Sequence, residues 1–138
     1  AQIVEEVVRP QLNLGRHVLL DRYADSTLAY QGYGHGINRA TLHQLLDFVT
    51  GGLWPDLTVL LDVDAETGLQ RRLSSHGEWN RLDDYDLDFH KRVRQGYLEM
   101  ARNEPARWRV IDAGQPPEKV QQELRQVILA HLRKNISQ

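Results

Sequence analysis

Two hydrophobic patterns alternate along the chain. Apolar residues three and four positions apart predict amphipathic helices, and short continuous apolar runs predict buried strands. The expected helices cover about 1–13, 39–50, 65–73, 86–103 and 116–135, with a further helix entered near residue 26. The expected strands are 17–21, 58–63 and 109–112. Strands that alternate with helices predict an α/β fold with a parallel sheet, in which each strand is buried on both faces.

Particular residues mark the faces and ends of these helices. The inward faces are expected at Ile3, Val4, Val7 and Val8 in the first helix and at Leu42, Leu45, Leu46 and Val49 in the second. Asn38 is a suitable N-cap, and Gly51-Gly52 follows the same helix. We expect a flexible turn over 32–36, where three glycines occur.

Aspartates occur at the carboxyl ends of all three expected strands, namely Asp21, Asp62 and Asp112. In open α/β sheets, ligands bind beyond the carboxyl ends of the strands. These ends are therefore where chemistry is expected.

Composition narrows the class of protein. The chain has 138 residues, of which 41% are hydrophobic and 26% charged, as in a single globular domain. A net charge of −2 predicts no nucleic-acid partner, and the lack of an apolar run of about 20 residues predicts no membrane span. There is no cysteine, which agrees with a cytoplasmic location.

The segment 21–32, Asp-Arg-Tyr-Ala-Asp-Ser-Thr-Leu-Ala-Tyr-Gln-Gly, is the richest in candidate chemistry. The Arg22 guanidinium is suited to phosphate, and the Asp21 carboxylate is suited to Mg²⁺ or to accepting a proton. The side chains that follow could hold a polar, planar base: Ser26, Thr27, Tyr30 and Gln31. On composition alone, an ordinary surface ion pair and helix cap is the favoured interpretation of the segment.

The same segment resembles the Asp-Arg-Tyr signature of the thymidylate kinases, with its trailing Ser-x-x-Ala-Tyr-Gln-Gly. This resemblance implies that Arg22 holds the dTMP phosphate and that Asp21 lies near Mg²⁺ and the transferred group. It also implies that Thr27 approaches the thymine edge and that Tyr30 packs beside the deoxyribose. Ser26 and Gln31 are expected to line the same pocket.

Further blocks resemble the family in order and spacing: 54–64, 68–72, 77–82, 87–97 and 110–113. They imply that ATP is bound by Arg71, Asp112 and Ala113. The stretch 74–84 is expected to be the lid, which has fewer arginines at its centre than family members of this type. Arg72 or Arg81 is expected to stabilise charge on the moving phosphoryl group.

The phosphate-binding sequence Gly-x-x-x-x-Gly-Lys-[Ser/Thr] does not occur in the chain. We therefore expect residues 1–138 to be the C-terminal two-thirds of one thymidylate kinase domain. The expected fold is a parallel sheet like that of the P-loop kinases, flanked by helices and lacking its first, central strand and its second strand. An unpaired sheet edge predicts that the chain alone is not stably folded or pairs its strands in a non-native way.

The resemblance implies transfer of the γ-phosphoryl group of MgATP to dTMP, giving dTDP, with the full-length family commonly forming homodimers. Without the phosphate loop, we expect no turnover from the chain as given. Two alternatives stay open. One is another nucleoside or nucleotide kinase, and the other is a non-catalytic remnant that binds dTMP or a partner chain.

Overall fold

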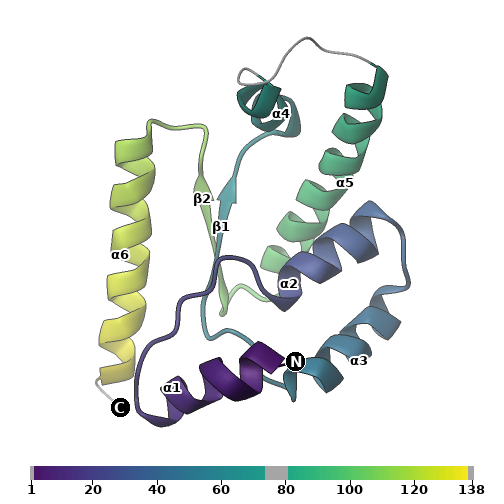
Figure 1. Cartoon of the computed structure of the whole chain (residues 1–138). Helices are drawn as coiled ribbons and strands as arrows, with labels where there is room; N and C mark the ends of the chain where they lie inside the picture. The colour runs from purple at the N-terminus through teal and green to yellow at the C-terminus, as the bar shows by residue number, and fades with distance from the viewer. Residues whose placement is uncertain (1, 74–80, 137–138) are drawn as a thin grey trace. The chain divides into compact units, whose positions relative to one another are not determined.

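The computed structural model describes residues 2–73 and 81–136 (Figure 1). The chain divides into two compact units, Ala1–Trp54 and Pro55–Gln138. The first unit is helical, whereas the second contains a small sheet. The expectation of a mixed α/β chain is confirmed.

The first unit opens with a π-helix, η1 (Val4–Val8), which continues into α1 (Arg9–Asn13). The backbone N–H of Arg9 donates to the carbonyl of Val4, five residues back. A wider turn suits the position, because the ring of Pro10 clashes with the fourth preceding carbonyl in a regular α-helix. The face is therefore not the one the sequence predicts: Val4 and Val8 are buried, but Ile3 and Val7 are at least half exposed.

The rest of the first unit comprises α2 (Ala24–Thr27), the π-helix η2 (Leu28–Gly34) and α3 (Arg39–Thr50). The predicted cap of α3 is confirmed, because the Asn38 side chain accepts a hydrogen bond from Thr41 N–H at 3.0 Å. Gly51 ends the helix with a left-handed φ of 60°. Arg9 Nη2 donates to the carbonyls of Thr50 and Gly51 at 3.0 and 2.9 Å, so it satisfies the last turn of α3.

Three further expectations for this unit are wrong. Leu45, predicted to face inward on α3, is 53% exposed. Gly32 and Gly34 lie buried within η2, so the flexible turn predicted over 32–36 is confined to Gly36, with φ of 75°.

The third is the strand predicted at 17–21: residues 16–20 have no regular structure, and Leu19 is 90% exposed. A strand is stabilised by a hydrogen-bonded neighbour, and the two strands among the described residues pair with each other.

The second unit is built on two parallel strands, β1 (Thr58–Asp62) and β2 (Trp108–Asp112). They pair in register from Thr58 opposite Trp108 to Asp62 opposite Asp112. Helices α5 (Arg81–Asn103) and α6 (Pro117–Ile136) lie on opposite sides of the strands, and α4 (Ala65–Leu73) follows β1 (Figure 1). The core of this unit is apolar: Leu69, Val93, Met100, Ala101, Trp108 and Ile111.

The sequence predicts that the helix α5 begins at residue 86, but it begins earlier, at Arg81. Of the predicted lid, residues 74–80 lie outside the described part of the chain. None of the helices in the described ranges is both long and apolar enough to cross a bilayer.

Candidate functional site

The turn before α2 places Asp21 and Arg22 at the surface. Both side chains are exposed, and Arg22 has a φ of 68°, the left-handed region that non-glycine residues rarely adopt. Tyr23 then returns to extended backbone, and α2 begins at Ala24. Backbone strain of this kind tends to occur at functional sites, where it sets the direction of a side chain.

The strained turn directs Arg22 over the helix that follows it. Its Nε donates a long hydrogen bond of 3.4 Å to Ser26 Oγ, and its Cζ lies 4.5 Å from the centroid of the Tyr30 ring. Within residues 2–73 and 81–136, neither Nη1 nor Nη2 of Arg22 has a hydrogen-bond partner. Three predicted site residues therefore meet, and the guanidinium keeps its forked donors for a ligand.

Buried neighbours fix the helix under this cluster. Ala24 and Leu28 are buried, and Ala29 is 0% exposed. The wide turn of η2 is closed by the N–H of His35, which donates to the carbonyl of Tyr30 at 3.0 Å. Single π-helical turns inside helices are frequent at functional sites. The remaining predicted residues of this half, Thr27 and Gln31, lie on the same helix, half-buried and exposed respectively.

Tyr23, the third residue of the Asp-Arg-Tyr signature, anchors the turn from beneath. Its hydroxyl donates to the carbonyl of Leu53 at 3.1 Å. Burial raises the pKa of Tyr23 above its ordinary value, and this outweighs the lowering effects of a hydrogen bond with Thr50 and of the Arg9 charge. The phenol therefore stays a neutral donor at physiological pH.

The second unit brings together the predicted ATP-binding residues. Arg71 Nη1, from α4, donates to the carbonyl of Ala113 at 3.1 Å, just beyond β2. The carboxylate of Asp112 accepts from Gly114 N–H at 2.7 Å, and the N–H of Ala113 donates to the carbonyl of Asp62 at 2.7 Å. The loop after β2 is thereby held against both β1 and α4.

An ion pair that the sequence reasoning missed lies at the same end of the sheet. Arg94, from α5, grips the Asp62 carboxylate with Nε at 2.7 Å and Nη2 at 2.8 Å. The side chain of Asp62 is 18% exposed and that of Arg94 38%. The hydrogen bond with Asp62 is the main cause that raises the pKa of Arg94 above its ordinary value. The position of Asp62 at a strand end indicated a functional residue, but the sequence did not indicate its partner, because Arg94 lies 32 residues away.

Asp64, just after β1, caps α4. Its Oδ1 accepts from the N–H of Thr67 at 2.8 Å. Hydrogen bonding by Thr67, through its side chain first and its backbone second, lowers the pKa of Asp64 below its ordinary value. The cap fixes the start of α4, and it thereby helps to fix the position of Arg71 on that helix.

Two predicted site residues lie at the edges of the described region. Arg72 belongs to α4 and Arg81 opens α5, but their side chains lie outside the described residues. Their role in charge stabilisation stays a prediction. Asp21 likewise stays a predicted metal ligand, and among the described residues no group of three or more histidine or carboxylate side chains could hold a metal.

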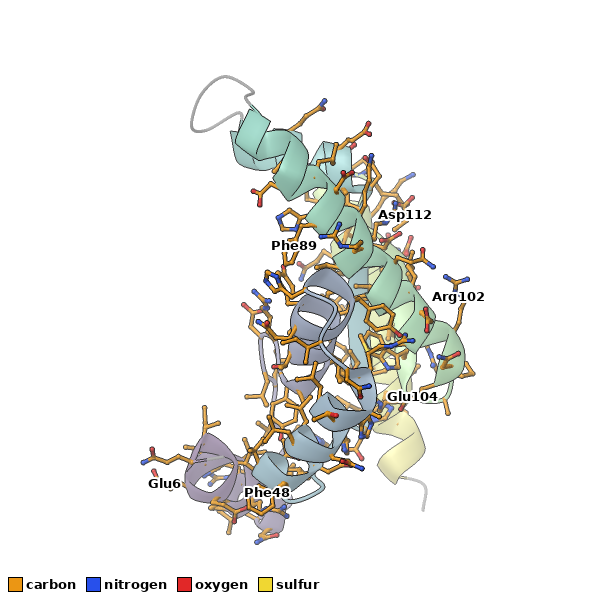
Figure 2. All side chains as sticks on the ribbon, turned by 90° about the vertical axis from the view of Figure 1, so that its right-hand side faces the viewer. Glu6, Phe48, Phe89, Arg102, Glu104 and Asp112 are labelled. Carbon is orange, nitrogen blue, oxygen red and sulfur yellow. The ribbon has the colours of Figure 1, made fainter. Side chains whose placement is uncertain are left out.

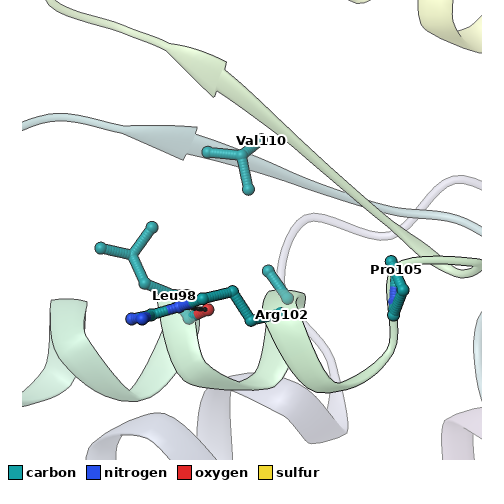
Figure 3. Close-up of a pocket in the computed structure, with 5 residues that line it drawn as sticks. Leu98, Arg102, Pro105 and Val110 are labelled. Carbon is teal, nitrogen blue, oxygen red and sulfur yellow. Dashed lines mark hydrogen bonds between the residues drawn. The ribbon is translucent and has the colours of Figure 1, made fainter.

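An apolar cavity of about 460 Å³ lies between α5 and β2 (Figure 3). It is lined by Leu98, Ala101, Arg102, Pro105 and Val110. Figure 2 shows Asp112 well separated from Glu104, which follows α5. Among the described residues that line the cavity, none belongs to the predicted site.

Known proteins match the chain over most of its length. The model of the family described as thymidylate kinase matches residues 1–124. The chain is 52% identical over 124 residues to the thymidylate kinase of Deinococcus radiodurans, covering 90% of this chain and 60% of that relative. It is 49% identical over 144 residues to that of Desulfovibrio desulfuricans, covering 97% and 64%.

A third relative, the thymidylate kinase of Thermomicrobium roseum, is 52% identical over 120 residues, covering 87% of this chain and 57% of the relative. The chain thus spans less than two thirds of the length of each of these relatives. The family model nevertheless covers far more than half of its residues. The chain therefore belongs to the thymidylate kinase family.

Proposed function

We propose that this chain supplies the dTMP-binding turn and part of the ATP-binding region of an enzyme that transfers the γ-phosphoryl group of ATP to dTMP, giving dTDP. The observation that carries the proposal is Arg22. Its guanidinium is exposed, is held by Ser26 and Tyr30, and has two Nη groups without a hydrogen-bond partner among the described residues. A guanidinium presented in this way matches a phosphate with two parallel hydrogen bonds.

The other residues of the turn have complementary tasks in this proposal. Thr27 and Gln31, on the same helix, contact the polar edge of thymine, and Tyr30 packs beside the deoxyribose. Asp21 is a single exposed carboxylate beside Arg22. Such a carboxylate fits Mg²⁺, which proteins commonly bind through one or two carboxylates together with the substrate phosphates. When bound, Mg²⁺ neutralises charge on those phosphates.

We propose that the loop after β2 borders the adenine of ATP. Arg71 holds the Ala113 carbonyl, and the Asp112 carboxylate holds the Gly114 N–H, so the loop is shaped before any nucleotide binds. Arg72 or Arg81 then neutralises charge on the moving phosphoryl group. Catalysis of this kind consists of positioning and electrostatic stabilisation, with no covalent intermediate on the protein.

The experiment that tests this function supplies the part of the enzyme that the chain does not span. In a chimaera, residues 1–138 replace the matching segment of the Deinococcus radiodurans thymidylate kinase. We expect the chimaera to convert dTMP to dTDP with ATP and Mg²⁺, and Arg22→Ala to abolish measurable turnover. The 138-residue chain alone should show none, because it contains no phosphate-loop sequence.

A substrate panel separates this proposal from its alternatives. A thymidylate kinase prefers dTMP, and Tyr30 predicts that ribonucleotides are rejected. Equal turnover of other nucleoside monophosphates would instead identify a broader nucleotide kinase. A chimaera that binds dTMP but never phosphorylates it would favour a non-catalytic binding role.

We further propose that the enzyme is cytoplasmic and acts as a homodimer. Apolar side chains are exposed at the start of the chain and on α3, and Arg9, just after η1, bonds the end of α3: Ile3, Val7, Leu45 and Phe48, the last 84% exposed. Figure 2 shows Glu6 of η1 and Phe48 on the same side of the first unit. An exposed apolar surface of this kind suits a protein–protein interface. Sedimentation of the chimaera should therefore give a dimer, and Phe48→Asp should give a monomer.

A further inference from the structure

We propose that Tyr30 is a positioning residue for Arg22: its ring holds the guanidinium in the orientation in which it receives the phosphate of the nucleotide. This rests on the proposed function, because it concerns the same site. It adds a role that is separable from packing beside the sugar.

The contact follows from the backbone on both sides of it. Arg22 has a left-handed φ of 68°, and Tyr23 continues in extended conformation with φ of −148° and ψ of −152°. The Arg22 side chain consequently lies over the helix that follows, with its Cζ 4.5 Å from the Tyr30 ring centroid. This distance is well within the range of about 6 Å for a cation–π interaction.

Tyr30 is the fixed partner in this contact. Its side chain is half-buried, whereas Arg22 is exposed. The preceding residue, Ala29, is 0% exposed, and the carbonyl of Tyr30 accepts from His35 N–H at 3.0 Å. The ring is therefore a rigid platform, and the longer arginine side chain is the part that it orders.

The platform restricts the guanidinium in a way that suits an anion. The guanidinium carbon lies over the Tyr30 ring, and Ser26 Oγ accepts a hydrogen bond from Nε at 3.4 Å. The edge that carries Nη1 and Nη2 is left as the donor edge, since these atoms have no hydrogen-bond partner in the described part of the chain. An arginine that is ordered before binding loses less conformational freedom when the phosphate arrives.

This role and a purely steric role predict different ligand dependences. If Tyr30 only shapes the sugar pocket, loss of its ring weakens dTMP and thymidine alike, because both carry the same deoxyribose. If Tyr30 orders Arg22, loss of the ring weakens dTMP selectively, because thymidine has no phosphate. The ratio of the two affinities therefore reports the positioning role.

The test is titration calorimetry of dTMP and of thymidine with the chimaera. We expect Tyr30→Leu to weaken dTMP about three- to fivefold more than it weakens thymidine, the effect of one partly exposed cation–π contact. Tyr30→Phe keeps the ring and should retain both affinities. The matched control is Tyr33→Leu in the same π-helix, because Tyr33 faces a different arginine, Arg39, at the same distance of 4.5 Å. It should change neither affinity.

Equal weakening of both ligands by Tyr30→Leu, or a Phe variant as weak as the Leu variant, would overturn the proposal. If circular dichroism shows that the Leu variant is misfolded, Tyr30→Met provides the same comparison with a more adaptable side chain. Failure of the underlying function has a different signature: the parent chimaera would bind thymidine as tightly as dTMP, and Arg22→Ala would change neither.

Discussion

The pair formed by Asp62 and Arg94 gives the sharpest energetic prediction. We expect the two side chains to be strongly coupled in the free energy of unfolding, which a double-mutant cycle measures. The variants are Asp62→Asn, Arg94→Met and the two combined, made in the chimaera. Asparagine keeps the shape of aspartate without its charge, and methionine keeps most of the length of arginine.

The magnitude follows from the geometry and exposure of the pair. Hydrogen bonds to charged groups contribute about 1.5–3 kcal/mol, whereas exposed ion pairs contribute about 0.2–1 kcal/mol. Two short bonds argue for the upper range, but Arg94 is 38% exposed, so solvent screening reduces their effect. We expect a coupling energy of about 2 kcal/mol, between these cases.

The single variants should differ. Arg94→Met leaves the Asp62 carboxylate, 18% exposed and opposite Asp112 in the sheet, without its cation. It should therefore destabilise by about 2–3 kcal/mol, at or below the low end of the range for removing one partner of a buried pair, because Arg94 is partly exposed. Asp62→Asn should destabilise less, because Arg94 can turn toward water.

The assay is urea denaturation at neutral pH, followed by circular dichroism. Lys91→Met serves as the control, because Lys91 also lies on α5 and pairs with Glu66 at 3.2 Å, but both side chains are at least half exposed. It should change the unfolding free energy by no more than about 0.5 kcal/mol. Single effects of Asp62→Asn and Arg94→Met that simply add in the double variant would refute the reasoning.

Four further predictions follow from single features of the structure. Gly51→Ala in the chimaera should lower the unfolding free energy by about 1–2 kcal/mol, because its Cβ would lie 2.6 Å from Arg9 Nη2 at a left-handed φ; Gly15→Ala, at a similar φ with open space, measures the backbone part alone. The pKa of Asp64 is lowered by folding, so its contribution is present above the unfolded-state pKa and is lost as the pH falls through the lower folded-state value; denaturation midpoints below about pH 4 should therefore fall more steeply for the parent than for Asp64→Asn. In urea denaturation, the unfolding free energy of Arg22→Gly should be about 0.5–1 kcal/mol higher than that of Arg22→Ala, since glycine relieves the left-handed strain. Calorimetry should nevertheless show that both variants lose dTMP binding. Finally, the 138-residue chain alone should not combine a cooperative thermal melt with monomeric sedimentation, because one edge of β1 has no strand partner among the described residues.

Local signals in the sequence were sufficient for much of the fold. Asn38 caps α3 as predicted, and Gly51 ends it, because both effects depend on residues within one turn. The apolar run 58–63 became β1, but the similar run 17–21 did not become a strand. The two runs differ in what lies beside them, since strand formation depends on pairing with a distant segment.

The candidate site divides in the same way. Arg22, Ser26 and Tyr30 are near neighbours in sequence, so the motif already contained their contact. The left-handed backbone at Arg22 and the π-helical turn at Leu28–Gly34 were not predictable, because no residue preference specifies them. The grip of Arg94 on Asp62 depends on how α5 packs against the sheet, which the local pattern does not contain.

The backbone at Arg22 shows why a motif of this kind is better explained by binding than by stability. A left-handed non-glycine residue costs about 1–2 kcal/mol, and an exposed cation–π contact contributes about 0.5–1 kcal/mol, so the contact offsets only part of the cost. Neither the turn nor the contact of Arg22 with Tyr30 stabilises the fold appreciably. Glycine in place of arginine would form the same turn without strain. What the arginine adds is a guanidinium with a defined orientation, and that orientation has value only when an anion binds it.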